Sequence, residues 1–178
     1  MIRAHAMRLF RTQGYEATTV QQIIEEVDVS ESTFFRYFPT KGDVVLTDDF
    51  DPLIVAAFES QPPDMSPIQA LRRAFNAAFG ELSPEQVSEQ SERMHLILQV
   101  TELRAAMLDQ FGQAMRLLAE VLARRTGRPP DDMRVLTLSG AVVGVATAVM
   151  FAMIDDPNAN LAVLLDEAMG NLEDGLRL

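Results

Sequence analysis

The chain has 178 residues, of which 48% are hydrophobic and 23% charged, a composition typical of a packed globular protein. It contains no cysteine, which excludes disulfide frameworks, thiolate metal sites and cysteine nucleophiles and fits a cytoplasmic location. The formal net charge is −11. Residues 1–47 hold five basic and six acidic residues, whereas residues 48–178 hold ten basic and twenty acidic residues. The acidity therefore belongs to the larger part of the chain and leaves the first quarter nearly neutral.

Two short helices are predicted at the start of the chain. An apolar stripe from Ile2 to Phe10 is followed by Gly14, a residue that commonly ends a helix in the left-handed conformation. Thr18 then begins a T-x-x-Q capping box with Gln21, which predicts the start of the second helix. The apolar face of this helix would be supplied by Val20, Ile23, Ile24 and Val27.

A third short helix follows after a tight turn. Ser30 can cap its first amides, and Pro39 ends it because proline has no backbone N–H. Phe34 and Phe38 fall on one face of this helix, and Arg36 falls on the opposite face. Two short helices joined by a turn and preceded by a supporting helix form a helix-turn-helix, whose second helix enters the major groove of DNA.

The rest of the chain also has helical patterns, and no region alternates with the period of a strand. The predicted helices run from about Lys41 to Ser60, from Pro67 through Phe79, from Pro84 to about Val100, from Thr101 to Arg125, from Asp131-Asp132 to the turn at Asp155, and from Ala159 to Leu176. The chain is therefore predicted to be all-α with nine helices. It divides into a head of residues 1–47 and a body of residues 48–178.

The run Leu138–Ile154 is 17 residues long and carries no charge. It is shorter than the ~20 apolar residues of a membrane span, and Asp155 and Asp156 close it, so we interpret it as a buried or dimer-packing helix. Its glycines lie one turn apart and would let another backbone approach closely. The residues predicted to contribute to dimerisation are Gly140, Gly144, Thr147 and Phe151.

The run LFRTQGYEATTVQQIIEEVDVSESTFFRYFPTKGDVVL closely resembles the DNA-binding domain of the TetR (tetracycline repressor) family, over residues 1 to about 47. Asp28 stands where the family usually has glycine, and aspartate tolerates the left-handed turn better than most residues. The chain begins inside the usual first helix, ahead of which family members typically carry a basic extension. The residues that carry the resemblance are Leu9-Phe10, Gly14-Tyr15, Thr18-Thr19-Val20, Ile23, Val29-Ser30, Thr33-Phe34-Phe35, Tyr37-Phe38 and Lys41.

This resemblance implies a set of DNA contacts. Thr18, Thr19 and Gln21 would clamp backbone phosphates at the start of the second helix, although capping alone is the alternative for the threonines. Lys41, the only lysine in the chain, would hold a further phosphate, and the alternative is a solvated surface lysine. The complete predicted DNA-binding set is Thr18, Thr19, Gln21, Ser30, Glu31, Ser32, Thr33, Phe35, Arg36, Tyr37 and Lys41.

The segments FFRYFPTKGDVV…DDFDPL and ERMHLILQVTELRAAML look like TetR regulators whose C-terminal domains are associated with acyl-CoA-like ligands. Methionine and phenylalanine can line a deformable apolar pocket, and an ordinary hydrophobic core is the alternative for each. An arginine could hold a phosphate or carboxylate of the ligand or form a surface salt bridge. The predicted ligand-binding set is Phe75, Phe79, Arg93, Met94, Leu98, Met107, Phe111 and Met115.

No catalytic constellation is recognisable, so we expect no enzyme activity, no cofactor and no metal. The two histidines, His5 and His95, lie on different elements, and the chain has no nucleophile elbow, phosphate loop or H-E-x-x-H motif. Asp48, Asp49 and Asp51 are interpreted as a solvated acidic surface.

The sequence thus predicts a ligand-responsive regulator of the repressor type, which binds a near-palindromic DNA operator as a homodimer and is released by a lipophilic effector. No membrane partner is expected. The alternative is a ligand-binding or adaptor protein whose DNA-binding head is too truncated to bind an operator.

Overall fold

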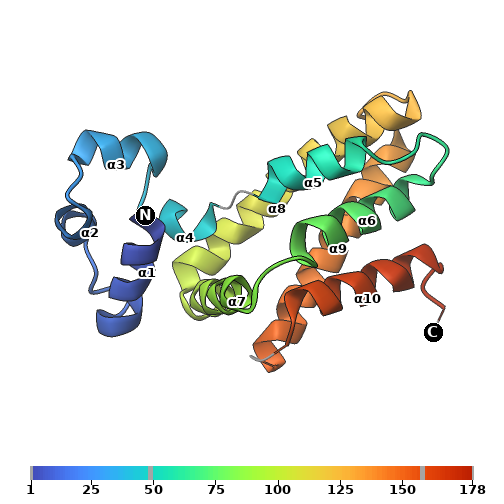
Figure 1. Cartoon of the computed structure of the whole chain (residues 1–178). Coiled ribbons are helices and arrows are strands. Elements are labelled where there is room, and N and C mark those ends of the chain that lie inside the picture. The colour runs from blue at the N-terminus through green and yellow to red at the C-terminus, as the bar shows by residue number, and fades with distance from the viewer. Residues whose placement is uncertain (1, 48–49, 157–158, 178) are drawn as a thin grey trace. The chain divides into compact units, whose positions relative to one another are not determined.

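The computed structural model describes residues 2–47, 50–156 and 159–177, and every regular element in those ranges is an α-helix (Figure 1). The all-α fold class predicted from the sequence is confirmed. The chain divides into two compact units, one of residues 1–48 and 92–107 and the other of residues 49–91 and 108–178. Asp48 and Asp49, part of the predicted acidic surface, lie outside the described residues.

The first unit begins with four helices, α1 (Ile2–Gln13), α2 (Val20–Val27), α3 (Glu31–Tyr37) and α4 (Asp43–Leu46). Helix α1 packs against α2 and α4, and α2 packs against α3. The apolar residues that the helical period placed inward are buried here. They include Ala6, Phe10, Ile23, Ile24 and Phe34.

The start of α2 differs from the prediction by one residue, so the predicted Thr18–Gln21 capping box is wrong. Thr19 is the N-cap: its hydroxyl accepts from the amide of Gln22 at 3.2 Å, and the Gln22 side chain accepts from the Thr19 amide at 2.9 Å. Thr18 is buried and donates its hydroxyl to the carbonyl of Gly14 at 2.7 Å. The sequence TTVQQ contains two overlapping capping boxes, and the burial of Thr18 decides between them.

The turn and the third helix agree with the prediction. Asp28 has the left-handed backbone that the turn requires, with φ 55° and ψ 49°. Ser30 caps α3 by accepting from the amide of Thr33 at 3.1 Å. Phe38 is extended and ends the helix directly before Pro39.

The helix predicted from Lys41 to Ser60 consists of two segments. Helix α4 ends at Leu46, and the next residue, Thr47, has an extended backbone with φ −71° and ψ 133°. Helix α5 (Phe50–Glu59) follows. Pro52 has no N–H, so it suits the first turn of a new helix and cannot support one continuous helix. The described chain accordingly holds ten helical segments for the nine predicted helices.

The second unit contains α5, α6 (Pro67–Phe79), the first part of α7 (Pro84–Gln99), most of α8 (Thr101–Thr126), α9 (Met133–Asp155) and α10 (Leu161–Glu173). Helix α6 packs against α5 and α10, and α10 also packs against α9. The core of this unit draws one or more residues from five helices. Its members include Ile54, Phe58, Leu71, Leu122, Val142 and Met169.

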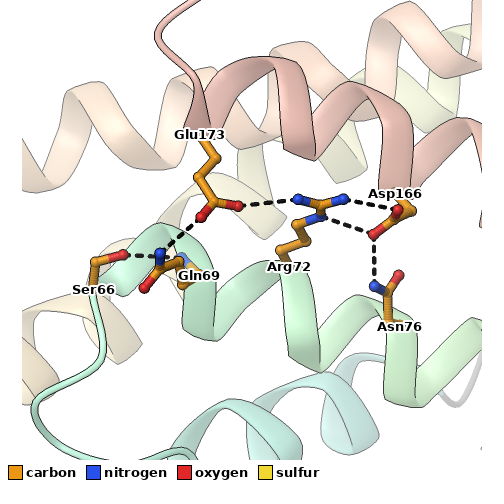
Figure 2. A network of polar contacts seen from close by, with 6 residues as sticks. All are labelled: Ser66, Gln69, Arg72, Asn76, Asp166 and Glu173. Carbon is orange, nitrogen blue, oxygen red and sulfur yellow. Dashed lines mark hydrogen bonds and ion pairs between the residues drawn. The ribbon is translucent and has the colours of Figure 1, made fainter.

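A network of polar side chains joins α6 to α10 (Figure 2). Arg72 donates through Nε and Nη2 to the two carboxylate oxygens of Asp166 at 2.8 and 2.9 Å, and through Nη1 to Glu173 at 3.1 Å. Asn76 donates to Asp166 at 2.6 Å, and Gln69 donates to Glu173 at 2.8 Å. The hydrogen bonds from Arg72 and then from Asn76 lower the pKa of Asp166 to about 2. Two helices far apart in the sequence are therefore tied by charged hydrogen bonds.

Removal of the guanidinium by Arg72→Ala should lower the free energy of unfolding by about 1 kcal/mol at neutral pH, because the pair is partly exposed and screened by solvent. The pKa of Asp166 is depressed, so its contribution is present above the ordinary value of 3.8 and is lost as the pH falls through about 2. In urea unfolding, the difference between wild type and variant should shrink from pH 4 toward pH 2. Arg73→Ala, at the exposed neighbouring position, is the control and should change stability by less than about 0.5 kcal/mol. A difference independent of pH would contradict the pairing.

Candidate nucleic-acid interface

Helix α3 presents a polar face outward because its opposite face is buried. Phe34 is fully buried, and its ring lies 5.8 Å from that of Phe38 and 5.3 Å from that of Phe35. A helix of seven residues is not stable alone in water, so this aromatic packing holds α3 on the head. Ser32 and Arg36 lie on the opposite face and are exposed. The flanking side chains of Glu31, Phe35 and Tyr37 are exposed as well.

The guanidinium of Arg36 lies over the ring of Tyr37, 5.0 Å from its centroid. Stacking uses the flat face of the guanidinium and leaves its N–H groups pointing outward in its plane. An exposed arginine arranged in this way can form two parallel hydrogen bonds with the edge of a guanine or with a phosphate.

The predicted hydroxyl and amide contacts lie at the starts of α2 and α3. Thr19 and Ser30 are exposed N-caps, and the Ser30 hydroxyl also lies 3.0 Å from that of Ser32 and 2.9 Å from that of Thr33. Gln21 is exposed and donates to the carboxylate of Glu25 at 2.9 Å. The Thr19 hydroxyl donates its own proton to the Gln22 side chain at 3.3 Å, so a phosphate that accepts from Thr19 would replace Gln22 as the acceptor and leave the cap in place. Thr18 is 1% exposed and lies inside the loop.

Lys41 has partners within the head. Its Nζ donates to the carbonyls of Tyr15 at 2.8 Å and Thr18 at 3.1 Å, and it lies 4.1 Å from the centroid of the Tyr15 ring. Burial, with smaller contributions from nearby carboxylates, raises the pKa of Tyr15 to about 12. The ammonium thus ties the loop between α1 and α2 to the start of α4. It has three N–H donors, so a phosphate contact would use the third.

Two arginines hold the C-terminal end of α4. Arg93 of α7 is 8% exposed and donates to the carbonyls of Val45 at 3.2 Å and Thr47 at 3.3 Å. Arg3 of α1 donates to the carbonyls of Val44 at 3.3 Å and Thr47 at 2.7 Å. Cations at a helix C-terminus are stabilised by the helix dipole. The sequence predicts Arg93 as a ligand-binding residue, and the structure places its guanidinium against the backbone of the head.

The other predicted ligand-binding residues fall in both units. On α6 the rings of Phe75 and Phe79 stack with centroids 6.4 Å apart, and the Phe79 ring lies 4.5 Å from that of Phe50 on α5. These three rings form an aromatic cluster in the second unit. The remaining members are Phe111 and Met115 in the second unit and Met94, Leu98 and Met107 in the first.

An open, mostly apolar groove of about 440 Å³ lies among α6, α9 and α10 in the second unit. None of the predicted ligand-binding residues lines this groove. Its lining residues are Ile68, Met133, Arg134, Thr137, Leu138, Ala141 and Leu172.

One face of α9 is uncovered in the single chain. Met133 is 73% exposed and Phe151 is 59% exposed. A Cβ added to Gly140 or Gly144 would meet no atom within 4 Å outside the helix's own nearby backbone, so both glycines face open space. Thr147 bonds the carbonyl one turn earlier at 2.8 Å. All four predicted dimerisation residues are thus at least partly accessible.

The same helix contains the single stretch of the described chain, Met133–Met153, that is long and apolar enough to cross a membrane by length and composition. Only 28% of the most apolar 18-residue segment of this stretch is buried within the single chain. Among the described residues, no group of three or more histidine, aspartate or glutamate side chains could hold a metal ion.

The chain is similar to known bacterial regulators along nearly its whole length. Residues 2–47 match the family model described as bacterial regulatory proteins, tetR family, and residues 65–177 match the model described as MftR C-terminal domain. The chain is 32% identical to the HTH-type transcriptional regulator TcmR of Streptomyces glaucescens, over 96% of this chain and 80% of that protein. It is 26% identical to the HTH-type transcriptional regulator EthR of Mycolicibacterium smegmatis, over 90% of this chain and 76% of that protein.

A solved structure has the same fold. It is the TetR family transcriptional repressor FadR of Thermus thermophilus, in complex with lauroyl-CoA, which superposes with a TM-score of 0.57 at 23% identity. The match covers 99% of this chain and 94% of that chain.

Lys41→Met keeps the apolar stem of the side chain and removes the ammonium that pairs two carbonyls. We expect the free energy of unfolding to fall by about 1–2 kcal/mol, because partly buried acceptors lose a charged donor. Urea unfolding followed by circular dichroism measures the loss. Arg36→Met, which removes an exposed charge from the outer face of α3, is the control and should stay within about 0.5 kcal/mol of wild type. Equal losses for the two variants would show that Lys41 does not support the loop.

Proposed function

The chain belongs to the TetR family of bacterial regulatory proteins, and we propose that this transcriptional regulator is a repressor that binds a near-palindromic operator as a homodimer. The observation that supports DNA binding most strongly is the two-sided character of α3. Phe34 is buried on one side, whereas Arg36 and its neighbours are exposed on the other. A short helix held in this way can enter the major groove and offer a guanidinium, hydroxyls and an apolar ring to the base edges.

The proposed contacts divide into two kinds. Arg36 and Glu31 would contact the bases, since arginine pairs with guanine and glutamate accepts from the N4 amine of cytosine. Thr19, Gln21 and Ser30 lie at exposed helix starts, where hydroxyl and amide groups hold phosphates. Lys41 would add a phosphate contact from its third N–H. The remaining proposed contacts come from Ser32, Thr33, Phe35 and Tyr37, and buried Thr18 supports the loop.

We assign homodimerisation to the exposed face of α9. An apolar helix with a small share of its surface buried is stabilised when a second copy covers it. Gly140 and Gly144 would let the two helices approach closely, and Thr147 and Phe151 would extend the contact. A twofold dimer presents two copies of α3, so the operator is expected to be nearly palindromic with half-sites roughly 34 Å apart.

The proposed effector is lipophilic and acyl-CoA-like. The resemblance of the body to acyl-CoA-associated regulators supports this class, as does the shared fold with FadR, whose structure contains lauroyl-CoA. Within the chain, the cluster of Phe50, Phe75 and Phe79 supplies apolar surface of the kind such a ligand needs. An effector that binds the DNA-incompetent arrangement more tightly shifts the population away from the operator complex.

Fluorescence anisotropy tests the proposed function. The purified chain first selects its preferred duplex from a random library, and binding of that duplex is compared with binding of a scrambled one at two salt concentrations. We expect binding that depends on both sequence and salt, and we expect lauroyl-CoA, used as the probe for the effector class, to release the selected duplex. If no sequence-dependent binding were found, the proposed repressor function would be wrong, and a ligand-binding or adaptor function would be favoured instead.

Arg36→Ala should weaken binding of the selected duplex by about 1–3 kcal/mol and relax the preference at one base pair of each half-site. The same titration with duplexes mutated at single positions measures this effect. A loss that is uniform across all sequences would assign Arg36 to a phosphate instead.

Gly144→Arg should convert the dimer to a monomer, because a large charged side chain would lie in the proposed interface. The single chain has open space at this position, so the variant is expected to fold. Sedimentation velocity measures the change, and circular dichroism confirms the helical content. Ala77→Arg, at an exposed position of α6, is the matched control and should remain dimeric. A dimeric Gly144→Arg variant would place the interface elsewhere.

A further inference from the structure

A large apolar side chain lies at the edge of the exposed surface of α3, beside the residues proposed to contact DNA. Phe35 is 42% exposed, although the buried side of the same helix already holds Phe34. On the helix surface Phe35 neighbours Glu31 and Ser32, which lie four and three residues earlier and are exposed and polar. The exposed part of the ring contacts water, so an apolar group of a bound duplex that covered it would stabilise the complex.

The ring of Phe35 is held in a defined orientation. It packs edge-to-face on the ring of Phe34, with an interplanar angle of 88° and 5.3 Å between centroids. Phe34 is 0% exposed and is therefore fixed by the core of the head. This contact with Phe34 restricts the orientation of the Phe35 ring and leaves the rest of the ring accessible.

The chemistry of the ring restricts what it can recognise on a duplex. Phenylalanine has no hydrogen-bonding group, so it cannot pair with a phosphate or with the donors and acceptors of a base edge. The apolar group that a base pair displays in the major groove is the C5-methyl group of thymine. Since α3 is the helix proposed to enter that groove, this methyl group is the partner that matches Phe35.

We propose that Phe35 is a specificity-determining residue that contacts the methyl group of a thymine in each operator half-site. The inference rests on the proposed function and adds a base preference to it. Arg36, one residue further along, would read hydrogen-bonding groups, whereas Phe35 would read an apolar one. Contact of the ring with deoxyribose carbons would give affinity without base preference, which the experiment separates.

The test replaces each thymine of the selected duplex by deoxyuridine, which removes the methyl group and keeps every hydrogen bond of the base pair. Wild type should bind about fourfold more weakly at one symmetry-related position per half-site, the loss expected when one buried methyl group is removed. Phe35→Ala should bind the original duplex more weakly and should show no further loss with deoxyuridine at that position. Fluorescence anisotropy measures all four combinations.

Three checks accompany these binding measurements. Leu53→Ala removes an exposed apolar side chain from α5, outside the proposed DNA contacts, and should retain both the affinity and the sensitivity to deoxyuridine. Circular dichroism of Phe35→Ala should match wild type, and the companion Phe35→Leu, which keeps an apolar side chain, should retain part of the sensitivity.

Selective binding by wild type with no sensitive thymine, or equal sensitivity in Phe35→Ala, would overturn the assignment of Phe35 and leave the proposed function intact. A uniform loss in Phe35→Ala without a deoxyuridine effect would assign the ring to the sugar-phosphate backbone. If wild type bound no duplex selectively, both proposals would fail.

Discussion

A helix of seven residues makes too few backbone hydrogen bonds to persist alone in water, so α3 depends on the burial of Phe34 in the head. The local sequence assists this packing. Asp28 adopts the left-handed backbone conformation of the turn between α2 and α3, and Ser30 caps the first amides of α3. Because one side of α3 is committed to the core, the other side is left exposed and held in position. Presentation of a fixed polar surface is thus a direct consequence of burying one aromatic ring.

The basic residues of the head divide between internal support and the exposed surface. Four of its five basic side chains have partners within the described chain: Arg3 and Lys41 bind backbone carbonyls, and Arg8 and Arg11 pair with glutamates. Arg36 stacks on its neighbouring ring and faces outward. A head with almost no net charge can therefore still offer a guanidinium where DNA is proposed to lie. Its proposed affinity depends on where these groups are placed rather than on overall charge.

Most of the fold could be predicted from the sequence because the signals are local. Helical periodicity, the cap at Ser30 and the prolines at positions 39 and 67 each act within a few residues of their own position. The sequence could not decide between Thr18 and Thr19, since burial of one threonine comes from tertiary packing. Nor could it indicate that Arg93 holds the end of α4, because that contact joins residues 46 to 48 positions apart. The proposed DNA-facing residues were accessible to sequence reasoning because they share one short helix and its flanking turns.

In the proposed complex, two copies of α3 contact one duplex from a symmetric dimer. Hydroxyl-radical footprinting of the selected duplex tests it most directly, because the method reports protected backbone at single-nucleotide resolution. We expect two protected regions related by symmetry on one face of the duplex, with centres about 10 base pairs apart or a multiple of that spacing. A single protected region, or protection unrelated by twofold symmetry, would contradict it.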